Sequence, residues 1–263
     1  MFSNPVKDRL RQGLPSVGNW ISLPSASVVE VISAHQPDWL VFDTEHGPAG
    51  WELVEDLARA VRGTGIVPMV RIAHSDPGLF KQAFDRGAFG VVVPMVSTPE
   101  QARAAVAWSK YPPEGIRGVA GSRVNRYGLD LPEYFAQWNQ IVLVALQVET
   151  PEALEHVDAI AATPGVDVLF VGPNDLSASL GVFRQFDHPT FRRALDRVLA
   201  ATARHGIAAG YMASSADEVL QRIDEGFRFV SAGSDTRMLA GAAAATYRTI
   251  RDGLAERKIA TRA

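Results

Sequence analysis

Cysteine is missing from all 263 residues of the chain. Its absence excludes disulfides, thiolate metal sites and cysteine nucleophiles, and it is compatible with a reducing compartment. No apolar run approaches the roughly 18 residues that span a bilayer, and the first residues, MFSNPVKDRLRQG, lack the apolar core of a signal peptide. We therefore expect a cytoplasmic protein that does not bind a membrane.

Lysine and runs of positive charge are also scarce. The formal net charge is −3 and no run of Lys or Arg occurs, which argues against nucleic acid as a partner. None of the four lysines follows a predicted strand, where a Schiff-base aldolase would need a buried lysine. Glycine-rich nucleotide-binding motifs and the G-x-S-x-G nucleophile motif are absent as well. The expected partner is a small molecule.

Eight short apolar runs, rich in valine, isoleucine and aromatic residues, alternate with stretches of helical period. Eight strand–helix units in a chain of this length predict a single (β/α)8 TIM barrel over residues 1–263. A doubly wound sheet, which usually has fewer strands, is the alternative. The Ala-rich segment at about 236–257 is predicted to be a helix that either contacts another subunit or caps the barrel. The predicted strands cover residues 17–23, 38–43, 66–72, 89–95, 141–148, 166–172, 207–212 and 227–233.

Two segments interrupt the regular alternation or follow it. The connection at 111–140 is long for a compact domain and contains Arg117, Arg123 and Arg126, which indicates a functional role or an oligomer contact. The sequence Gly-Ser-Asp at 233–235, after the eighth strand, is a candidate phosphate site of the kind found in such barrels.

Two carboxylates stand directly after apolar runs that we interpret as neighbouring strands. Glu149 follows the fifth strand and Asp175 the sixth, and Gln147 lies on the same face of its strand as Glu149. Adjacent strands are about 5 Å apart, so both acids can reach one cation. Each acid alone is also compatible with a helix start, Asp175 as an N-cap and Glu149 through its charge. Together they favour an oxygen-liganded ion such as Mg²⁺ or Mn²⁺ over structural zinc.

Further polar residues are expected at the same end of the barrel. The second strand runs into FDTEHG, which contains Asp43, Glu45 and His46, and the third strand ends in Arg71. A carboxylate can orient an imidazole and raise its basicity, so His46 is a candidate base, with a structural role as the alternative. Arg71 either holds an anionic oxygen or pairs with one of these acids. Asp85, near a helix C-terminus, has an external partner or is a solvated surface acid.

Seven motifs carry a family resemblance. In chain order they are FDTEHG, PMVRI, VVVPMV, YPPEGIRG, LQVET, VGPNDLS and VSAGSDT. Through them, residues from about 17 to 245 resemble the HpcH/HpaI aldolase family, in particular its metal-dependent class II pyruvate aldolases. The resemblance implies a TIM barrel whose last helix is exchanged between subunits of a homo-oligomer, typically a hexamer. It also implies reversible cleavage of 4-hydroxy-2-oxo acids to an aldehyde and pyruvate, or a close 2-oxo acid such as hydroxypyruvate.

The same resemblance implies how the metal and the 2-oxo acid are bound. Glu149 and Asp175 would be the protein ligands of Mg²⁺, Mn²⁺ or Co²⁺, which would hold the enolate. Gln147 would contact the 2-oxo acid, whose carboxylate would be received by the backbone at Asn174 and Asp175. Family members often carry Ala at the position of Asn174, and the backbone contact is expected to survive this difference.

The resemblance also assigns the proton-transfer residues. His46 would be the catalytic base, Arg71 would stabilise the enolate oxygen, and Asp43 would lie near the metal-bound water. Asp85 would reach His46 of a neighbouring subunit and strengthen it as a base. The match fades around 119–130, a region expected to help select the aldehyde.

Two other functions remain open at this point. One is an acyl-CoA lyase of the malyl- or citryl-CoA type on the same scaffold, although no basic, adenine-stacking extension is evident in the sequence. The other is a non-catalytic barrel that binds a small anion. The combination of acids, arginine and histidine argues against the second, because a binding module does not need His46.

Overall fold

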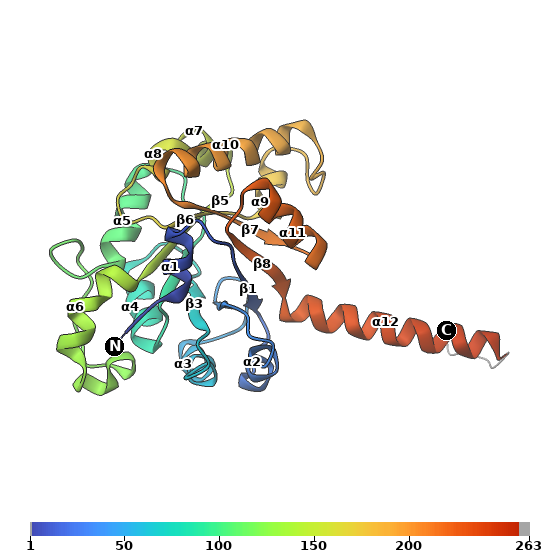
Figure 1. Cartoon of the computed structure of the whole chain (residues 1–263), viewed down its shortest axis with the longest axis horizontal. Helices are drawn as coiled ribbons and strands as arrows, with labels where there is room; N and C mark the ends of the chain where they lie inside the picture. The colour runs from blue at the N-terminus through green and yellow to red at the C-terminus, as the bar shows by residue number, and fades with distance from the viewer. Residues whose placement is uncertain (1, 258–263) are drawn as a thin grey trace.

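The computed structural model describes residues 2–257 and shows eight parallel strands closed into a barrel, with helices around it (Figure 1). Each strand coincides with one of the predicted apolar runs, so the predicted TIM barrel is confirmed and the doubly wound sheet is wrong. Residue 1 and residues 258–263 of the predicted domain lie outside the described residues. The strands are β1 Ser16–Ile21, β2 Trp39–Asp43, β3 Val67–Arg71, β4 Gly90–Val93, β5 Leu143–Val148, β6 Val168–Val171, β7 Ala208–Ala213 and β8 Phe229–Ser234.

Helices follow the strands, and their ends coincide with local sequence signals. Thr98 forms a capping box with Gln101, and Gly87, Gly206 and Gly226 end three helices in the left-handed conformation. The helices are α1 Pro5–Arg11, α2 Ala26–Ser33, α3 Trp51–Ala60, α4 Pro77–Arg86, α5 Pro99–Ser109, the 3₁₀ helix η1 Arg123–Gly128, α6 Leu131–Ile141, α7 Pro151–Glu155, α8 Val157–Ala161, α9 Pro173–Ser179, α10 Pro189–His205, α11 Ala216–Glu225 and α12 Asp235–Glu256.

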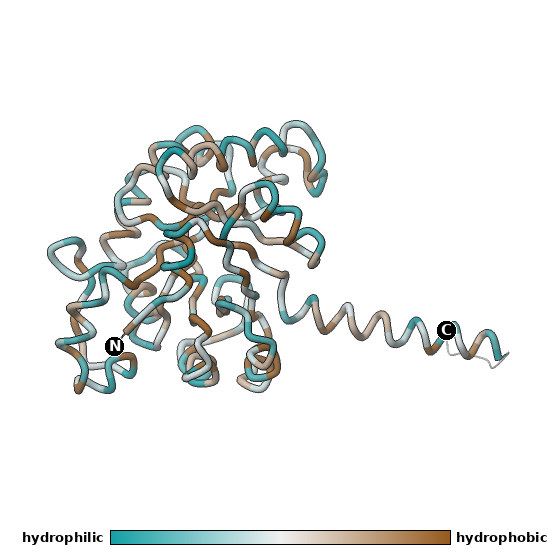
Figure 2. The backbone as a smooth tube through the Cα atoms, in the orientation of Figure 1, coloured by the Kyte–Doolittle hydropathy of each residue, from teal (hydrophilic) through white to brown (hydrophobic). Residues whose placement is uncertain are grey.

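Aromatic side chains fill the interior of the barrel, where Figure 2 shows the strands as predominantly hydrophobic. Trp39 stacks on Phe229 with ring centroids 4.1 Å apart, and Trp20 stacks on Phe170 at 5.2 Å. Gly18 on β1 leaves room for this layer, because a Cβ there would lie 2.1 Å from the Trp39 ring. The filled interior restricts ligands to the two ends of the barrel.

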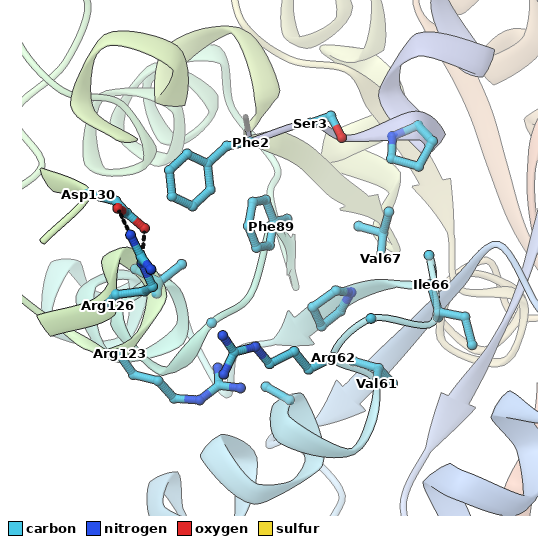
Figure 3. A pocket seen from close by; sticks show the side chains of 17 residues that line it. Phe2, Ser3, Val61, Arg62, Ile66, Val67, Phe89, Arg123, Arg126 and Asp130 are labelled. Carbon is cyan, nitrogen blue, oxygen red and sulfur yellow. Dashed lines mark hydrogen bonds and ion pairs between the residues drawn. The ribbon is translucent and has the colours of Figure 1, made fainter. Parts of the chain in front are cut away.

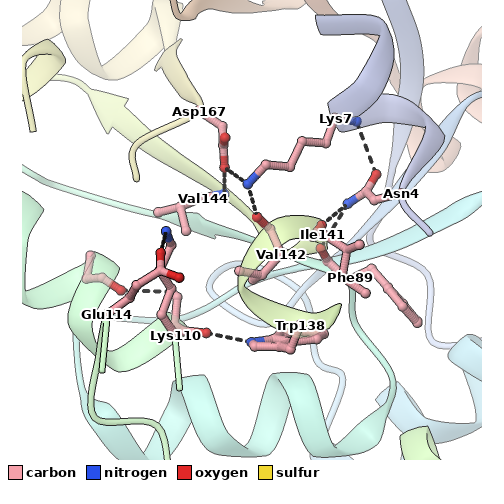
Figure 4. Close-up of polar contacts among 12 residues, drawn as sticks. Asn4, Lys7, Phe89, Lys110, Glu114, Trp138, Ile141, Val142, Val144 and Asp167 are labelled. Carbon is pink, nitrogen blue, oxygen red and sulfur yellow. Dashed lines mark hydrogen bonds and ion pairs between the residues drawn. The ribbon is translucent and has the colours of Figure 1, made fainter. Parts of the chain in front are cut away.

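Helix α1 closes the N-terminal end of the barrel (Figure 4). Lys7 donates to the carbonyl oxygen of Val142 at 2.5 Å and to Asp167 Oδ2 at 3.0 Å. Asn4 donates to the carbonyl oxygen of Ile141 at 2.8 Å. Burial lowers the pKa of Lys7, and its contact with Asp167 opposes this effect. This lysine therefore has a structural role at the end opposite to the predicted site.

Helix α12 departs from the barrel instead of covering it (Figure 1). Of its 22 residues only Asp235 is buried, while Met238, Leu239, Tyr247 and Ile250 expose apolar side chains. The helix predicted at 236–257 is thus confirmed, and the idea that it caps its own barrel is wrong. Within residues 2–257, no helix combines the length and apolar character needed to cross a bilayer.

Candidate active site

The C-terminal ends of β2, β3, β5 and β6 bring the predicted residues to one rim of the barrel. Asp43 and Arg71 are register partners on β2 and β3. Val148 of β5 pairs with Val171 of β6, so Glu149 follows the pair on one strand and Gly172 on the other. The two strands predicted to be neighbours are neighbours, as the two-carboxylate site requires.

Arg71 is held rigidly at this rim. Its Nε and Nη2 donate to the two oxygens of Asp43 at 2.9 and 2.6 Å, and its Nη1 lies 3.0 Å from Glu45 Oε2. The guanidinium also lies over the Trp20 ring, 5.5 Å from its centroid. A guanidinium has five N–H groups, and these three contacts leave two for a ligand. Pairing with an acid, one of the two predicted possibilities, therefore does not prevent Arg71 from holding an anionic oxygen.

Asp43 organises the turn that contains His46, but it does not touch the imidazole. Its Oδ1 accepts from the backbone N–H groups of Glu45 at 3.1 Å and His46 at 3.3 Å. The imidazole is exposed and has no hydrogen-bond partner among residues 2–257. The sequence predicted that a nearby carboxylate, Asp43 or Glu45, could orient the imidazole. Neither acid is hydrogen-bonded to it in the described chain, and both oxygens of Asp43 are taken by Arg71 and the backbone. Burial raises the pKa of Glu45, opposed by the charges of Arg71 and His46.

Glu149 is buried at the end of β5, with 4% of its surface exposed. Its Oε1 accepts a short hydrogen bond from Gln147 Nε2, and its Oε2 accepts from the backbone N–H of Met95 at 3.1 Å. Burial raises the pKa of Glu149 to about 7, assisted by the negative charges of Asp175 and Glu45. An ionised carboxylate in this place lacks a compensating positive charge in direct contact, which a cation would supply.

Three further observations fit a divalent cation beside Glu149. Gln147 Oε1 is buried and has no hydrogen-bond partner in the described chain, so an acceptor oxygen is available. Gly172 leaves space at the carboxylate, because a Cβ there would lie 2.5 Å from Glu149 Oε1. Asp175 is exposed in the first turn of α9, and its charge acts on Glu149. Carboxylate and amide oxygens are the ligands that Mg²⁺ and Mn²⁺ prefer.

Glu149 and Asp175 are the two carboxylates of the candidate metal site. Within residues 2–257 no group of three or more His, Cys, Asp or Glu side chains is arranged to hold a metal. A cation held by Glu149 and Asp175 would therefore keep coordination positions free for water and substrate. Asn174 is the other exposed residue of this turn, and its backbone lies in the first turn of α9, where helical N–H groups lack partners within the helix.

Asp85 does not join this rim in its own chain. It lies near the end of α4, towards the N-terminal ends of the strands, and accepts from Arg117 Nη2 at 3.1 Å. Arg117 is fully buried among aromatic rings, with its guanidinium carbon 4.2 Å from the Trp138 ring centroid. The interpretation of Asp85 as a solvated surface acid is thus wrong. No sequence signal identified Arg117 as its partner, because the pair depends on how a long connection folds back.

The region at 119–130 also lies away from the rim of its own chain. Its 3₁₀ helix η1 contacts α4, and Arg123 donates to the carbonyl oxygen of Arg86 at 3.0 Å, at the N-terminal end of the barrel. Within one subunit this position contradicts the expected role in selecting the aldehyde, since the two ends are separated by the filled interior.

A cleft borders the rim next to Asn174, and only the Gly-Ser-Asp segment at 233–235 hinted at it in the sequence. Its volume is about 380 Å³ and it lies at the ends of β6, β7 and β8. Arg184 and Arg237 line it, and neither has a carboxylate partner in the part of the chain that the structure describes. Its one acid, Glu218, already accepts from Ser214 and pairs with a buried arginine. Gly233 and Ser234 of the predicted phosphate site form part of its wall, whereas the buried Asp235 accepts from the backbone N–H groups of Ser22 and Leu23.

The raised pKa of Glu149 predicts how the metal-free protein responds to pH. Between its ordinary value of 4.5 and about 7, the folded protein binds a proton that the unfolded chain releases. The contribution of Glu149 to the free energy of unfolding should therefore be largest below pH 4.5. It should fall by up to about 3 kcal/mol as the pH rises to 7. Thermal unfolding in EDTA from pH 5 to 8 measures this fall.

Two variants isolate the contribution of Glu149 to this pH dependence. Glu149→Gln should flatten the dependence between pH 5 and 7, whereas Glu152→Gln, at an exposed position of α7, should retain it. A curve for Glu149→Gln parallel to that of the wild type would contradict the assignment.

Known proteins resemble the whole barrel. Residues 16–242 match the model of the HpcH/HpaI aldolase/citrate lyase family. A 5-keto-4-deoxy-D-glucarate aldolase of Salmonella paratyphi C is 37% identical over 236 residues, which are 89% of this chain and 92% of the relative. The crystal structure of an HpcH/HpaI aldolase/citrate lyase family protein from Burkholderia cenocepacia has a TM-score of 0.90 at 37% identity, covering 95% of this chain and 100% of that one. A citrate synthase, SbnG, has a TM-score of 0.85 at 26% identity, covering 94% and 97%.

Proposed function

Because the chain belongs to the HpcH/HpaI aldolase/citrate lyase family, we propose that it reversibly cleaves 4-hydroxy-2-oxo acids to an aldehyde and a 2-oxo acid. A relative that is 37% identical over 89% of this chain is named an aldolase, and the chain is accordingly a lyase of this class. The 2-oxo acid is pyruvate or a close analogue such as hydroxypyruvate. The observation that supports this reaction best is the buried Glu149 beside Asp175, with the clamped Arg71 close enough for its charge to act on Glu149.

We propose that Glu149 and Asp175 hold a divalent ion, Mg²⁺, Mn²⁺ or Co²⁺. When bound, the ion would supply Lewis acidity towards the 2-oxo acid. Gln147 is placed to donate to or accept from the 2-oxo acid, since its amide lies beside Glu149 with one oxygen unused. The backbone N–H groups of Asn174 and Asp175 would receive the substrate carboxylate.

Arg71 and His46 would carry out the charge stabilisation and the proton transfer. The two unused N–H groups of Arg71 would hold the oxygen on which negative charge develops when the carbon–carbon bond breaks. His46, exposed at the same rim, would remove the proton of the C4 hydroxyl in cleavage and a C3 proton of the 2-oxo acid in synthesis. Asp43 acts as a positioning residue, because it fixes both Arg71 and the backbone of His46.

The cleft beside Asn174 would receive the aldehyde portion of the substrate. It adjoins the turn that carries Asp175, and Arg184 and Arg237 give it positive charge. Glucarate, in the name of the relative's substrate, is a sugar diacid, and a second carboxylate suits two unpaired guanidinium groups.

Proton exchange of pyruvate tests the reaction without knowledge of the aldehyde. In deuterated buffer the protein should exchange the methyl protons of pyruvate, as seen by ¹H NMR. EDTA should reduce the rate about 100-fold or more, and added Mg²⁺ or Mn²⁺ should restore it, because the ion supplies several kcal/mol of charge stabilisation. Full exchange in EDTA would contradict the metal-dependent mechanism. Absence of exchange with metal present, or cleavage of malyl-CoA in place of 4-hydroxy-2-oxo acids, would favour the binding-module or acyl-CoA alternatives.

Removal of Arg184 tests the cleft as the site of the aldehyde portion. Arg184→Gln should raise KM about tenfold for a 4-hydroxy-2-oxo acid with a distal carboxylate, since one charged contact is lost. A substrate with an uncharged distal end should be affected little. Arg193→Gln, an exposed arginine of α10 outside the cleft, serves as the matched control. Equal effects on both substrates would show that the cleft does not recognise the distal carboxylate.

We also propose that the chain forms a homo-oligomer, typically a hexamer, in which the C-terminal helices are exchanged between subunits. Helix α12 extends from the barrel with exposed apolar residues, among them Met238 and Tyr247, that another subunit would cover. In such an assembly Asp85 would approach His46 of a neighbour. The molar mass in solution, measured by multi-angle light scattering, tests this proposal, and a monomer would contradict it.

A further inference from the structure

A cavity of about 420 Å³ lies at the N-terminal end of the barrel, opposite to the candidate active site (Figure 3). The loops that precede β3 and β4, the end of α3 and the 3₁₀ helix η1 surround it. Phe2 and Phe89 form apolar walls, together with Ile66 and Val67. The filled barrel interior separates this cavity from the rim, so its ligand would not be the substrate of the proposed reaction.

Two guanidinium groups converge at the edge of this cavity. Figure 3 shows the side chains of Arg62 and Arg123 directed towards one another, and the charge of Arg62 acts on Arg123. In the described chain neither has a carboxylate ion-pair partner. Arg123 is half-buried and makes a hydrogen bond to the carbonyl oxygen of Arg86. The charge of Glu55 also acts on Arg123 but forms no ion pair with it, and two like charges held together without a carboxylate in contact favour an anion between them.

The acids nearby are already occupied. Asp130 receives Nε and Nη2 of Arg126 at 2.5 and 2.6 Å. Glu55 on α3 pairs with Arg59 and lies 3.2 Å from Arg86. Asp130 or Glu55 could neutralise Arg62 or Arg123 only by giving up one of these existing ion pairs.

The segment that carries Arg123 is fixed before any ligand binds. Asn125 is fully buried and its side chain makes three hydrogen bonds to the backbone of its own loop. It accepts from the N–H groups of Ser122 at 3.0 Å and Gly128 at 2.9 Å, and donates to the carbonyl oxygen of Ala120 at 2.8 Å. A rigid site loses less conformational entropy when it binds a ligand.

From this arrangement we infer that the cavity is a binding site for a small carboxylate with an apolar body. The carboxylate would bind Arg62 and Arg123, and its aromatic or branched aliphatic portion would lie between Phe2 and Phe89. The cavity volume is in the range of small-molecule sites, and its combination of apolar walls with few convergent polar groups is typical of them.

Calorimetric titration of the full-length, native oligomer with phenylacetate tests the site, with EDTA present to exclude binding through a metal. Phenylacetate should bind saturably at millimolar concentration or below, and its neutral isostere phenylacetamide at least about tenfold more weakly. Arg123→Met and Arg62→Met should each weaken phenylacetate binding about tenfold. Arg103→Met, an exposed arginine of α5 paired with Glu100, should leave it unchanged.

Two further variants keep the test independent of folding and of the rim. Ser3→Trp places a large side chain at the cavity wall without a change of charge, and it should abolish binding. Glu149→Gln, at the other end of the barrel, should bind phenylacetate as the wild type does. Equal binding of the acid and the amide, unchanged binding in Arg123→Met and Ser3→Trp, or no saturable binding to the wild type would each overturn the inference.

Discussion

Arg71→Ala is expected to lower kcat about 100- to 1,000-fold, with a much smaller change in KM for the 2-oxo acid. The reason is that the two free N–H groups of Arg71 would act on charge that develops only as the carbon–carbon bond breaks. A binding role in the ground state would instead change kcat and KM together. Steady-state kinetics of 4-hydroxy-2-oxo acid cleavage separates the two cases, and an equal loss in both would argue against the enolate role.

The stability of this variant has to be measured together with its activity. Removal of Arg71 leaves the buried Asp43 and the half-buried Glu45 without their counter-charge, which costs about 3–5 kcal/mol when one partner of a buried pair is lost. Arg71→Lys keeps a positive charge but cannot reproduce the forked contact with Asp43, so it should fold better and still lose most of kcat. Arg103→Ala, on the exposed face of α5, is the matched control and should retain wild-type kinetics.

Glu149→Gln is expected to abolish metal binding and, with it, more than about 99.9% of the cleavage activity. The substitution keeps the size of the side chain, so its packing against Gly172 and the backbone N–H of Met95 should change little. The negative charge is lost, together with one of the two acceptor oxygens, and a divalent ion needs that charge. Titration with Mn²⁺, followed by electron paramagnetic resonance, measures the affinity directly.

The fold and the affinity of this variant should respond in opposite directions. In the absence of metal, the neutral glutamine removes the unfavourable buried charge, so the variant should be at least as stable as the wild type at pH 7. Glu152→Gln, three residues later and exposed, should bind Mn²⁺ normally. Wild-type Mn²⁺ affinity in Glu149→Gln would refute the assignment of this residue as a ligand.

The strands could be predicted because each is a short apolar run bounded by turn residues, a local property of the chain. Helix ends such as those at Gly87 and Gly206 could be predicted for the same reason, since only glycine readily adopts the left-handed conformation there. Helix α1 was missed because its seven residues have a weak period. Its stability depends instead on distant partners, such as Asp167 for Lys7.

The candidate site could be predicted in its residues but not in its contacts. Glu149 and Asp175 could be identified because an acid that follows a buried strand is costly to leave unpaired. From the sequence, Arg71 could either hold an anionic oxygen or pair with a nearby acid. Its ion pairs with Asp43 and Glu45 became visible only with the register of β2 on β3.

By itself, the sequence determined the (β/α)8 architecture and the end of the barrel at which the acids lie, because strand alternation and strand ends are encoded locally. Tertiary structure alone decided which charges meet. It paired Asp85 with the buried Arg117, gathered Arg184 and Arg237 beside Asn174, and brought Arg62 and Arg123 together at the opposite end. These contacts join residues far apart in the chain, and electrostatic attraction depends on distance in space, which no local pattern records.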